Sequence, residues 1–200
     1  MPKGMRQTFD FEQLIIMNWR ASSGDIAAVV GPPGCGKTTV GSGLAVRMVV
    51  EGIGNRVLLV AYTNTAVNEF GRGLCNILDP NTARRLCLRT GNPAGIDPSI
   101  LIHFSVQADD IRSRRIILCT TMSLKRLTST MRFDNMIIDE ASIEKLQHLL
   151  LPFQYGINQM VSSVQIYQDN ITNGIDNIMD LASHNGVVAT VVGDPKQSNR

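Results

Sequence analysis

The chain has 200 residues, of which 44% are hydrophobic and 18% are charged, and its net charge is +2 at pH 7. This length and composition suit one globular domain with a sizeable core. No apolar run reaches the length of a transmembrane helix, the polar amino terminus lacks a signal-peptide pattern, and the four cysteines include no C-x-x-C pair. These features exclude the membrane-spanning class and argue against a secreted, disulfide-stabilised or zinc-bound protein, so we expect an intracellular setting.

The hydrophobic pattern predicts strands and helices in alternation along the chain. We expect strands at 25–31, 56–62, 85–91, 114–121, 133–142 and 186–197, and helices at 38–50, 65–78, 122–130 and 143–151. Strands that are almost continuously apolar and alternate with helices are typical of a parallel sheet covered on both faces. The predicted fold is therefore a doubly wound α/β domain, which binds its ligands at the carboxyl ends of the strands.

A stretch of roughly thirty residues separates the last two predicted elements. Within it, Ile157, Val161, Val164, Ile171, Ile175, Ile178 and Ala182 recur near helical spacing. We interpret residues 154–185 as an amphipathic helical insertion before the last strand, which packs against the domain.

The segment from Gly31 to Thr38 matches the phosphate-loop pattern G-x-x-x-x-G-K-[ST], between a predicted strand and a predicted helix. Its glycines allow the backbone to curl and approach phosphate oxygens, and the following helix presents its positive end to them. Lys37 is expected to reach the β- and γ-phosphates, and the hydroxyl of Thr38 is expected to hold Mg²⁺.

Two acidic residues end the predicted strand at 133–142. At a strand end beside a phosphate loop, Asp139 can hold Mg²⁺ through water, and Glu140 can orient and deprotonate the attacking water. This pair favours hydrolysis of the nucleotide. The last strand leads into Asp194 and Gln197, where a glutamine could touch the γ-phosphate, although Gly-Asp-Pro is also an ordinary turn sequence.

The positive charge is unevenly distributed. Residues 62–132 contain ten Lys or Arg against five Asp or Glu, a surplus of five. Such a surplus could form part of a phosphate-contacting face or a solvated surface, and charge alone does not decide between them. The basic residues are Arg72, Arg84, Arg85, Arg89, Arg112, Arg114, Arg115, Lys125, Arg126 and Arg132.

Taken together, these motifs resemble superfamily 1 helicases, in the branch that contains the nonsense-mediated-decay RNA helicase and related DNA and RNA helicases. The family's first motif corresponds to 31–38, its second to 139–141 and its third to 193–197. The resemblance implies a RecA-like domain that binds and hydrolyses ATP with Mg²⁺. The residues expected to contact the nucleotide or its metal ion are Gln13, Gly31, Pro32, Pro33, Gly34, Cys35, Gly36, Lys37, Thr38, Thr39, Asp139, Glu140 and Gln197.

The same resemblance implies contacts with single-stranded DNA or RNA. The stretches LLVAYTNTAVNEF, LCLRTG and ILCTT are similar to the family's nucleic-acid motifs, with contacts expected at Thr63, Asn64, Arg89, Thr120 and Thr121. By this likeness the basic segment at 62–132 becomes a strand-binding face. Residues 1–200 would form the first half of a two-domain motor, whose second half supplies arginine fingers.

Two local departures from the family pattern concern single positions. Cys35 stands where these helicases usually carry threonine, and Gln197 is followed by Ser-Asn-Arg in place of the usual leucine and proline. Two other functions stay open: a nucleotide-gated nucleic-acid-binding module that does not unwind, and an unrelated phosphate-loop ATPase. No Asn-Lys-x-Asp guanine-reading motif occurs, which argues against a GTPase.

Overall fold

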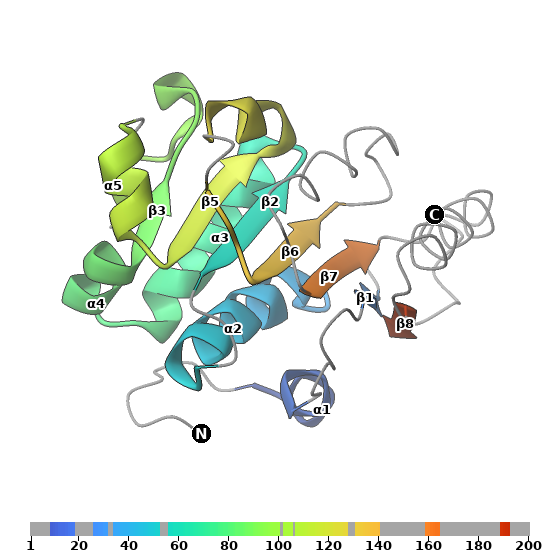
Figure 1. The fold of residues 1–200 in the computed structure, drawn as a ribbon. Coiled ribbons are helices and arrows are strands. Elements are labelled where there is room, and N and C mark those ends of the chain that lie inside the picture. Colours follow the sequence, from blue (N-terminus) through green and yellow to red (C-terminus); the bar gives the residue numbers. More distant parts are fainter. Residues whose placement is uncertain are drawn as a thin grey trace.

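The computed structural model describes residues 9–18, 26–31, 34–52, 56–100, 102–105, 107–127, 131–140, 159–164 and 189–192. Within these residues the chain forms an eight-stranded sheet in the order β4-β3-β5-β2-β6-β7-β1-β8 (Figure 1). Every pair of neighbouring strands is parallel. The strands are β1 (Ile26–Val30), β2 (Val57–Ala61), β3 (Cys87–Arg89), β4 (His103–Phe104), β5 (Ile116–Thr120), β6 (Asn135–Asp139), β7 (Gln159–Val164) and β8 (Ala189–Val192).

One helix precedes the first strand, and the others connect the strands. The helices are α1 (Phe11–Asn18), α2 (Lys37–Val50), α3 (Asn64–Ile77), α4 (Pro80–Leu86) and α5 (Ala108–Ser113), with 3₁₀ turns η1 (Pro93–Gly95) and η2 (Thr121–Arg126). From β1 the chain steps outward to β4 and then returns through β5, β6 and β7. Because parallel crossovers are right-handed, the outward and return connections lie on opposite faces of the sheet. Figure 1 shows α5 in front of the sheet and α3 behind it, which confirms the predicted doubly wound α/β fold.

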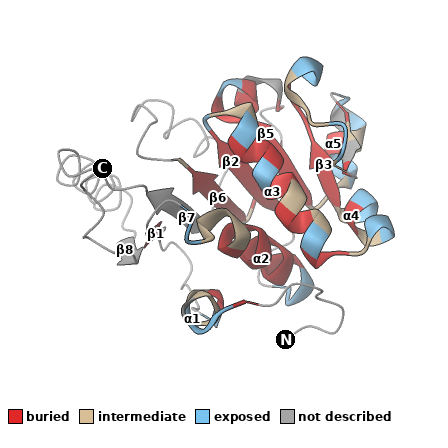
Figure 2. Ribbon diagram, turned by 180° about the vertical axis from the view of Figure 1, so that it is seen from behind, coloured by how far each residue is buried: buried red, intermediate tan, exposed pale blue. Residues whose placement is uncertain are grey.

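The core lies between the sheet and the pair formed by α2 and α3. All five residues of β2, β5 and β6 are buried, as continuous apolar strands inside a parallel sheet should be. Figure 2 shows buried residues along α2 and on the inner side of α3, while the outer side of α3 is exposed. The two helices approach closely because Gly41 and Gly73 carry no side chain: a Cβ on Gly41 would lie 2.9 Å from the Phe70 ring, and one on Gly73 would lie 2.5 Å from Ser42 Oγ.

The predicted helical insertion is wrong where the structure describes it. Gln159–Val164 is a strand, β7, instead of part of a helical insertion. It pairs with β1 on one side and β6 on the other, so its backbone hydrogen-bonding groups are satisfied by two neighbours. A central strand of a parallel sheet is buried on both faces, so its apolar and polar residues need not alternate. The spacing of apolar residues over a short segment therefore does not distinguish such a strand from a helix. The rest of 154–185 lies outside the described residues.

Three short helices were not predicted, and two of them carry start signals. Asp10 and Gln13 cap α1 reciprocally: Gln13 N donates to Asp10 Oδ1 at 2.8 Å, and Asp10 N donates to Gln13 Oε1 at 3.2 Å. Asp79 caps α4 by accepting from two backbone N–H groups, with Pro80 at the first helical position. The expected helix at 122–130 is a 3₁₀ turn over Thr121–Arg126, and the expected helix at 143–151 lies outside the described residues.

Candidate nucleotide-binding and hydrolytic site

The phosphate loop follows β1 and leads into α2, as its sequence predicts. Gly34 has a φ of 78° and Gly36 a φ of 85°, conformations that residues with a side chain rarely adopt. Lys37 is the first residue of α2, and its Nζ donates to Gly31 O at 2.6 Å, across the loop. The loop therefore places an ammonium group and a helix amino terminus around one concave turn, which suits an anion. Pro32 and Pro33 lie outside the described residues.

The hydroxyl of Thr38 and the carboxylate of Asp139 meet although they are 101 positions apart: Thr38 Oγ1 donates to Asp139 Oδ2 at 2.6 Å. Asp139 ends β6 and is buried, and β6 pairs with β2 on one side and β7 on the other. A hydroxyl and a carboxylate in contact provide two oxygen ligands of the kind Mg²⁺ prefers, beside a loop that suits phosphates. The residues present thus fit a magnesium nucleotide.

Glu140 has a constrained backbone. Its φ is 58°, in a region that non-glycine residues occupy rarely, and its N–H donates to Asp139 Oδ1 at 2.9 Å. Its carboxylate oxygen Oε2 accepts from Thr63 Oγ1 at 3.0 Å and from Thr63 N at 3.3 Å. Thr63 in turn caps α3 by accepting from Ala66 N. Glu140, which follows β6, is therefore hydrogen-bonded to the N-cap residue of α3.

Three further predicted nucleotide contacts lie on or beside the loop. The amide nitrogen of Gln13 donates to Cys35 O at 3.4 Å, so α1 is joined to the phosphate loop. Cys35 is exposed, and its sulfur lies 3.8 Å from Lys37 Nζ. Thr39 lies in the first turn of α2. Recognition of adenine by Gln13 stays a prediction, since in this structure its amide caps α1 and contacts the loop.

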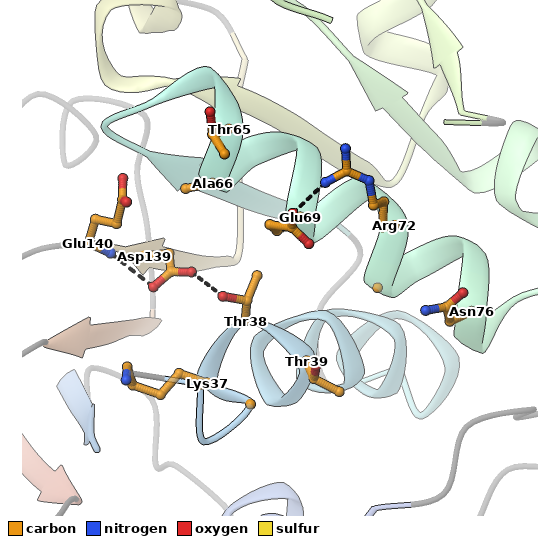
Figure 3. Close-up of a pocket in the computed structure, with 13 residues that line it drawn as sticks. Lys37, Thr38, Thr39, Thr65, Ala66, Glu69, Arg72, Asn76, Asp139 and Glu140 are labelled. Carbon is orange, nitrogen blue, oxygen red and sulfur yellow. Dashed lines mark hydrogen bonds and ion pairs between the residues drawn. The ribbon is translucent and has the colours of Figure 1, made fainter. Parts of the chain in front are cut away.

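A pocket of about 530 Å³ opens between the phosphate loop, α3 and the end of β6 (Figure 3). Predicted residues form one side of it: Gly34, Gly36, Lys37, Thr38, Thr39, Asp139 and Glu140. Residues of α3 that were not predicted from the sequence form the other side: Thr65, Ala66, Glu69, Arg72, Gly73 and Asn76. Polar residues recur in α3 at intervals of four, three and four positions from Thr65 to Asn76, and this polar stripe was the available signal.

The third-motif residues Asp194 and Gln197 lie outside the described residues, but the strand before them is described. β8 lies at the sheet edge beyond β1, and β7 occupies the position between β1 and β6. The expected role of Gln197 at the γ-phosphate stays a prediction.

The five predicted nucleic-acid contacts gather at the carboxyl edge of neighbouring strands. β2 and β5 pair with Ala61 opposite Thr120, and β3 and β5 pair with Arg89 opposite Leu118. Their accessibility differs sharply. Thr63 and Asn64 are half-buried, whereas Arg89 is 2% exposed, Thr120 is 7% exposed and Thr121 is 2% exposed. Of these five side chains only those of Thr63 and Asn64 are partly exposed, and the Thr63 hydroxyl already donates to Glu140 Oε2 and accepts from Ala66 N.

The basic residues of 62–132 do not gather into one face at that edge. Six of them lie on segments that enter β3, β5 or β6, and so at the amino edge of the sheet: Arg84, Arg85, Arg112, Arg114, Arg115 and Arg132. Arg89 is buried, and Arg72 pairs with Glu69 and Asp97. Only Lys125 and Arg126, in η2, follow a strand at the carboxyl edge. The basic segment was expected to become a strand-binding face, but its charges are divided between the two edges of the sheet, because strand direction separates charges that are close in sequence.

The fold and the phosphate loop define a phosphate-loop α/β domain of the RecA-like type. The family described as AAA domain matches residues 8–114, more than half of the chain, and the chain belongs to this family. No curated protein sequence matches it. None of the described helices is long and apolar enough to cross a membrane.

Three solved structures that share this fold are described as an ATPase core, a helicase and a helicase domain. The Sulfolobus solfataricus SWI2/SNF2 ATPase core in complex with dsDNA is 16% identical, with a TM-score of 0.64, over 90% of this chain and 36% of that one. The UvsW helicase from bacteriophage T4 is 10% identical (TM-score 0.62; 92% and 60% covered). The Pyrococcus furiosus Hef helicase domain is 15% identical (TM-score 0.62; 92% and 38% covered). At these identities the likeness concerns the fold, and the chain spans 36% to 60% of the length of these structures.

Proposed function

We propose that this chain is the ATP-binding and hydrolysing motor domain of a nucleic-acid helicase or translocase of superfamily 1. The observation that carries the proposal is a hydrogen bond that joins the phosphate-loop pocket to the edge of the sheet where nucleic acid is expected. Thr38, Asp139 and Glu140 form the hydrolytic end of a phosphate-loop pocket, and Glu140 is bonded to Thr63, next to Asn64 at the edge expected to hold nucleic acid. A motor requires such a connection, because hydrolysis must depend on the track.

Each residue has a role that its position supports. Lys37 offers its ammonium group to the β- and γ-phosphates, and the backbone N–H groups at the start of α2 bind the other phosphate oxygens. Thr38 and Asp139 hold Mg²⁺, which when bound neutralises charge on the phosphates. Glu140 orients the attacking water and accepts its proton. Gln197 is proposed to contact the γ-phosphate.

The proposed partners are ATP, Mg²⁺ and single-stranded DNA or RNA. Thr63 and Asn64 are proposed to grip the sugar-phosphate backbone, a mode of binding that does not read bases and so allows translocation. A second α/β domain with arginine fingers completes the motor, and an intracellular setting, in nucleus or cytoplasm, belongs to the same proposal.

The experiment is ATP hydrolysis by the full-length protein, with and without a single-stranded oligonucleotide. We expect stimulation that falls steeply with added salt, because binding releases counterions from the strand. Replacing Thr63 and Asn64 together by alanine should remove the stimulation. Asn81 and Thr82 on α4 provide a matched pair of the same residue types at the other edge of the sheet, and their replacement should leave it intact.

The outcomes separate the candidate functions. Stimulation of hydrolysis together with strand separation supports a helicase. Nucleotide-dependent strand binding without separation indicates the nucleotide-gated binding module. Hydrolysis that is indifferent to DNA and RNA at low salt refutes the motor and favours an unrelated phosphate-loop ATPase.

A further inference from the structure

Asn64, at the start of α3, is held by an arginine that does not reach the surface. Arg89 Nη2 donates to Asn64 Oδ1 at 2.7 Å, and Arg89 Nη1 donates to the backbone oxygen of Thr90. Arg89 is 2% exposed, and its Nε is buried without a hydrogen-bond partner. Among the described residues no carboxylate forms an ion pair with it. From the sequence, Arg89 was expected to contact nucleic acid directly, and its burial argues against a direct contact.

A buried, unpaired guanidinium is costly, so its arrangement needs a reason. Burial lowers the pKa of Arg89, in keeping with a side chain removed from water. The absence of a side chain at Gly91 leaves room for the Arg89 guanidinium. Gly91 has a φ of 142°, and a Cβ there would lie 3.0 Å from Arg89 Nη1. The main side-chain acceptor that this cation finds is the amide oxygen of Asn64, 25 positions away.

The other side of the Asn64 amide is closed by the turn at Pro93–Gly95. A Cβ on Gly95 would lie 2.4 Å from Asn64 Nδ2 and Cγ, so the amide lies directly beside the glycine. The turn is itself tied to α3, since Asn68 Nδ2 donates to Gly95 O at 3.0 Å. Arg89 and Gly95 therefore confine the Asn64 side chain from two sides.

This position fixes which end of the amide is available. A guanidinium has only donors, so the atom of Asn64 that faces Arg89 must be the oxygen. The other atom, Nδ2, has no hydrogen-bond partner among the described residues and is not fully buried. Asn64 therefore presents a donor at the carboxyl edge of the sheet and keeps its acceptor inside.

We propose that Arg89 is a positioning residue, which orients Asn64 so that Nδ2 donates to a phosphodiester oxygen of a bound nucleic-acid strand. Arg89 itself does not touch the phosphate. This inference rests on the proposed function and assigns a chemical role to each member of the pair. It predicts that the pair acts as one unit, and that only one of its two members faces the ligand.

The first test is a double-mutant cycle on binding of a labelled single-stranded oligonucleotide at several salt concentrations. Asn64→Ala should weaken binding about ten-fold or more, as expected for loss of a hydrogen bond to a charged group. Arg89→Gln should have a similar effect, and the double variant should be no worse than either one. The salt dependence should be unchanged in Arg89→Gln, whereas loss of a direct phosphate contact lowers its slope by about 0.7 for a single strand. Arg85→Gln, an exposed arginine on α4, is the matched control.

Two further variants test the proposal while keeping the Arg89 side chain in place. Asn64→Asp gives Arg89 a carboxylate partner, so it should raise the melting temperature while oligonucleotide binding is lost, because the donor is replaced by a negative charge. Gly95→Ala should displace the Asn64 amide and weaken binding as much as Asn64→Ala does. If the pair had only a structural role, the affinity of each variant for the oligonucleotide would instead rise and fall with its melting temperature.

The outcomes are distinguishable. If the wild-type protein binds no single strand at low salt, the proposed function fails and the inference with it. If the wild type binds but the losses in Asn64→Ala and Arg89→Gln are additive, or the salt slope falls in Arg89→Gln, Arg89 is a direct contact and the inference alone is overturned. Binding by Asn64→Asp at wild-type affinity overturns it as well.

Discussion

The change Glu140→Gln separates chemistry from nucleotide binding. The carboxylate of Glu140 accepts two hydrogen bonds from Thr63 through a single oxygen, Oε2. The amide oxygen of glutamine can accept the same two bonds, and the backbone N–H of residue 140 still donates to Asp139. The folded structure and the phosphate loop should therefore be retained. What the substitution removes is the negative charge and the ability to take a proton from water.

A positioned general base typically contributes 10²–10⁴-fold to a rate, which is about 3–5 kcal/mol in the barrier. We expect a loss of that size in the rate of ATP hydrolysis by Glu140→Gln, with the affinity for ATP within about three-fold of wild type. The free energy of unfolding should change by less than about 1 kcal/mol, because no buried hydrogen-bonding group loses its partner.

The assay is single-turnover hydrolysis of radiolabelled ATP by the full-length protein, with nucleotide affinity measured separately by titration of a fluorescent analogue. Glu51→Gln is the control, since Glu51 also pairs with a side chain of the domain, Arg47, but lies at the far end of α2. Turnover of Glu140→Gln at the wild-type rate would refute the assignment. A parallel loss of ATP affinity would show that Glu140 binds the nucleotide instead of acting on water.

Three more predictions follow from single contacts. Lys37→Ala should weaken ATP binding about 10- to 100-fold in a fluorescence titration, because a cation facing the phosphates is lost; equal affinity would contradict this role. At neutral pH, iodoacetamide should modify exposed Cys35 first, and ATP should slow that reaction, whereas Cys119, whose pKa burial raises to about 12, should stay unmodified, as mass spectrometry can verify. Hydrogen bonds from Ser99, and then from Arg72, lower the pKa of Asp97 to about 2. Because this folded pKa lies below the unfolded value of about 4, the carboxylate stabilises the protein above pH 4 and that contribution is lost between pH 4 and 2. In urea titrations the deficit of Asp97→Asn should be constant near neutral pH and should shrink over that interval; a deficit that persists at pH 2 would count against the assignment.

The sequence by itself determined those parts of the site that depend on neighbouring residues. A phosphate loop needs its glycines, lysine and threonine at fixed spacing, and the structure gives Gly34 and Gly36 the positive φ values that this requires. Asp139 was expected at a strand end because an apolar run precedes it, and it lies there. The α/β class followed from the same local alternation of apolar strands and helices.

Only the tertiary structure decided what depends on strand order. β7 became a strand because β1 and β6 supply hydrogen bonds on both of its sides, and no local pattern reports that. The bond between Thr63 and Glu140 joins positions 77 apart, and it exists because β2 and β6 are neighbours. Arg89 stands in a motif that suggested an exposed contact, but its strand carries it into the interior against Asn64. The burial and the partners of a side chain depend on which helices and strands pack beside it. The packing of those elements depends on the whole chain, because the free energy of packing and hydrogen bonding outweighs local conformational preference.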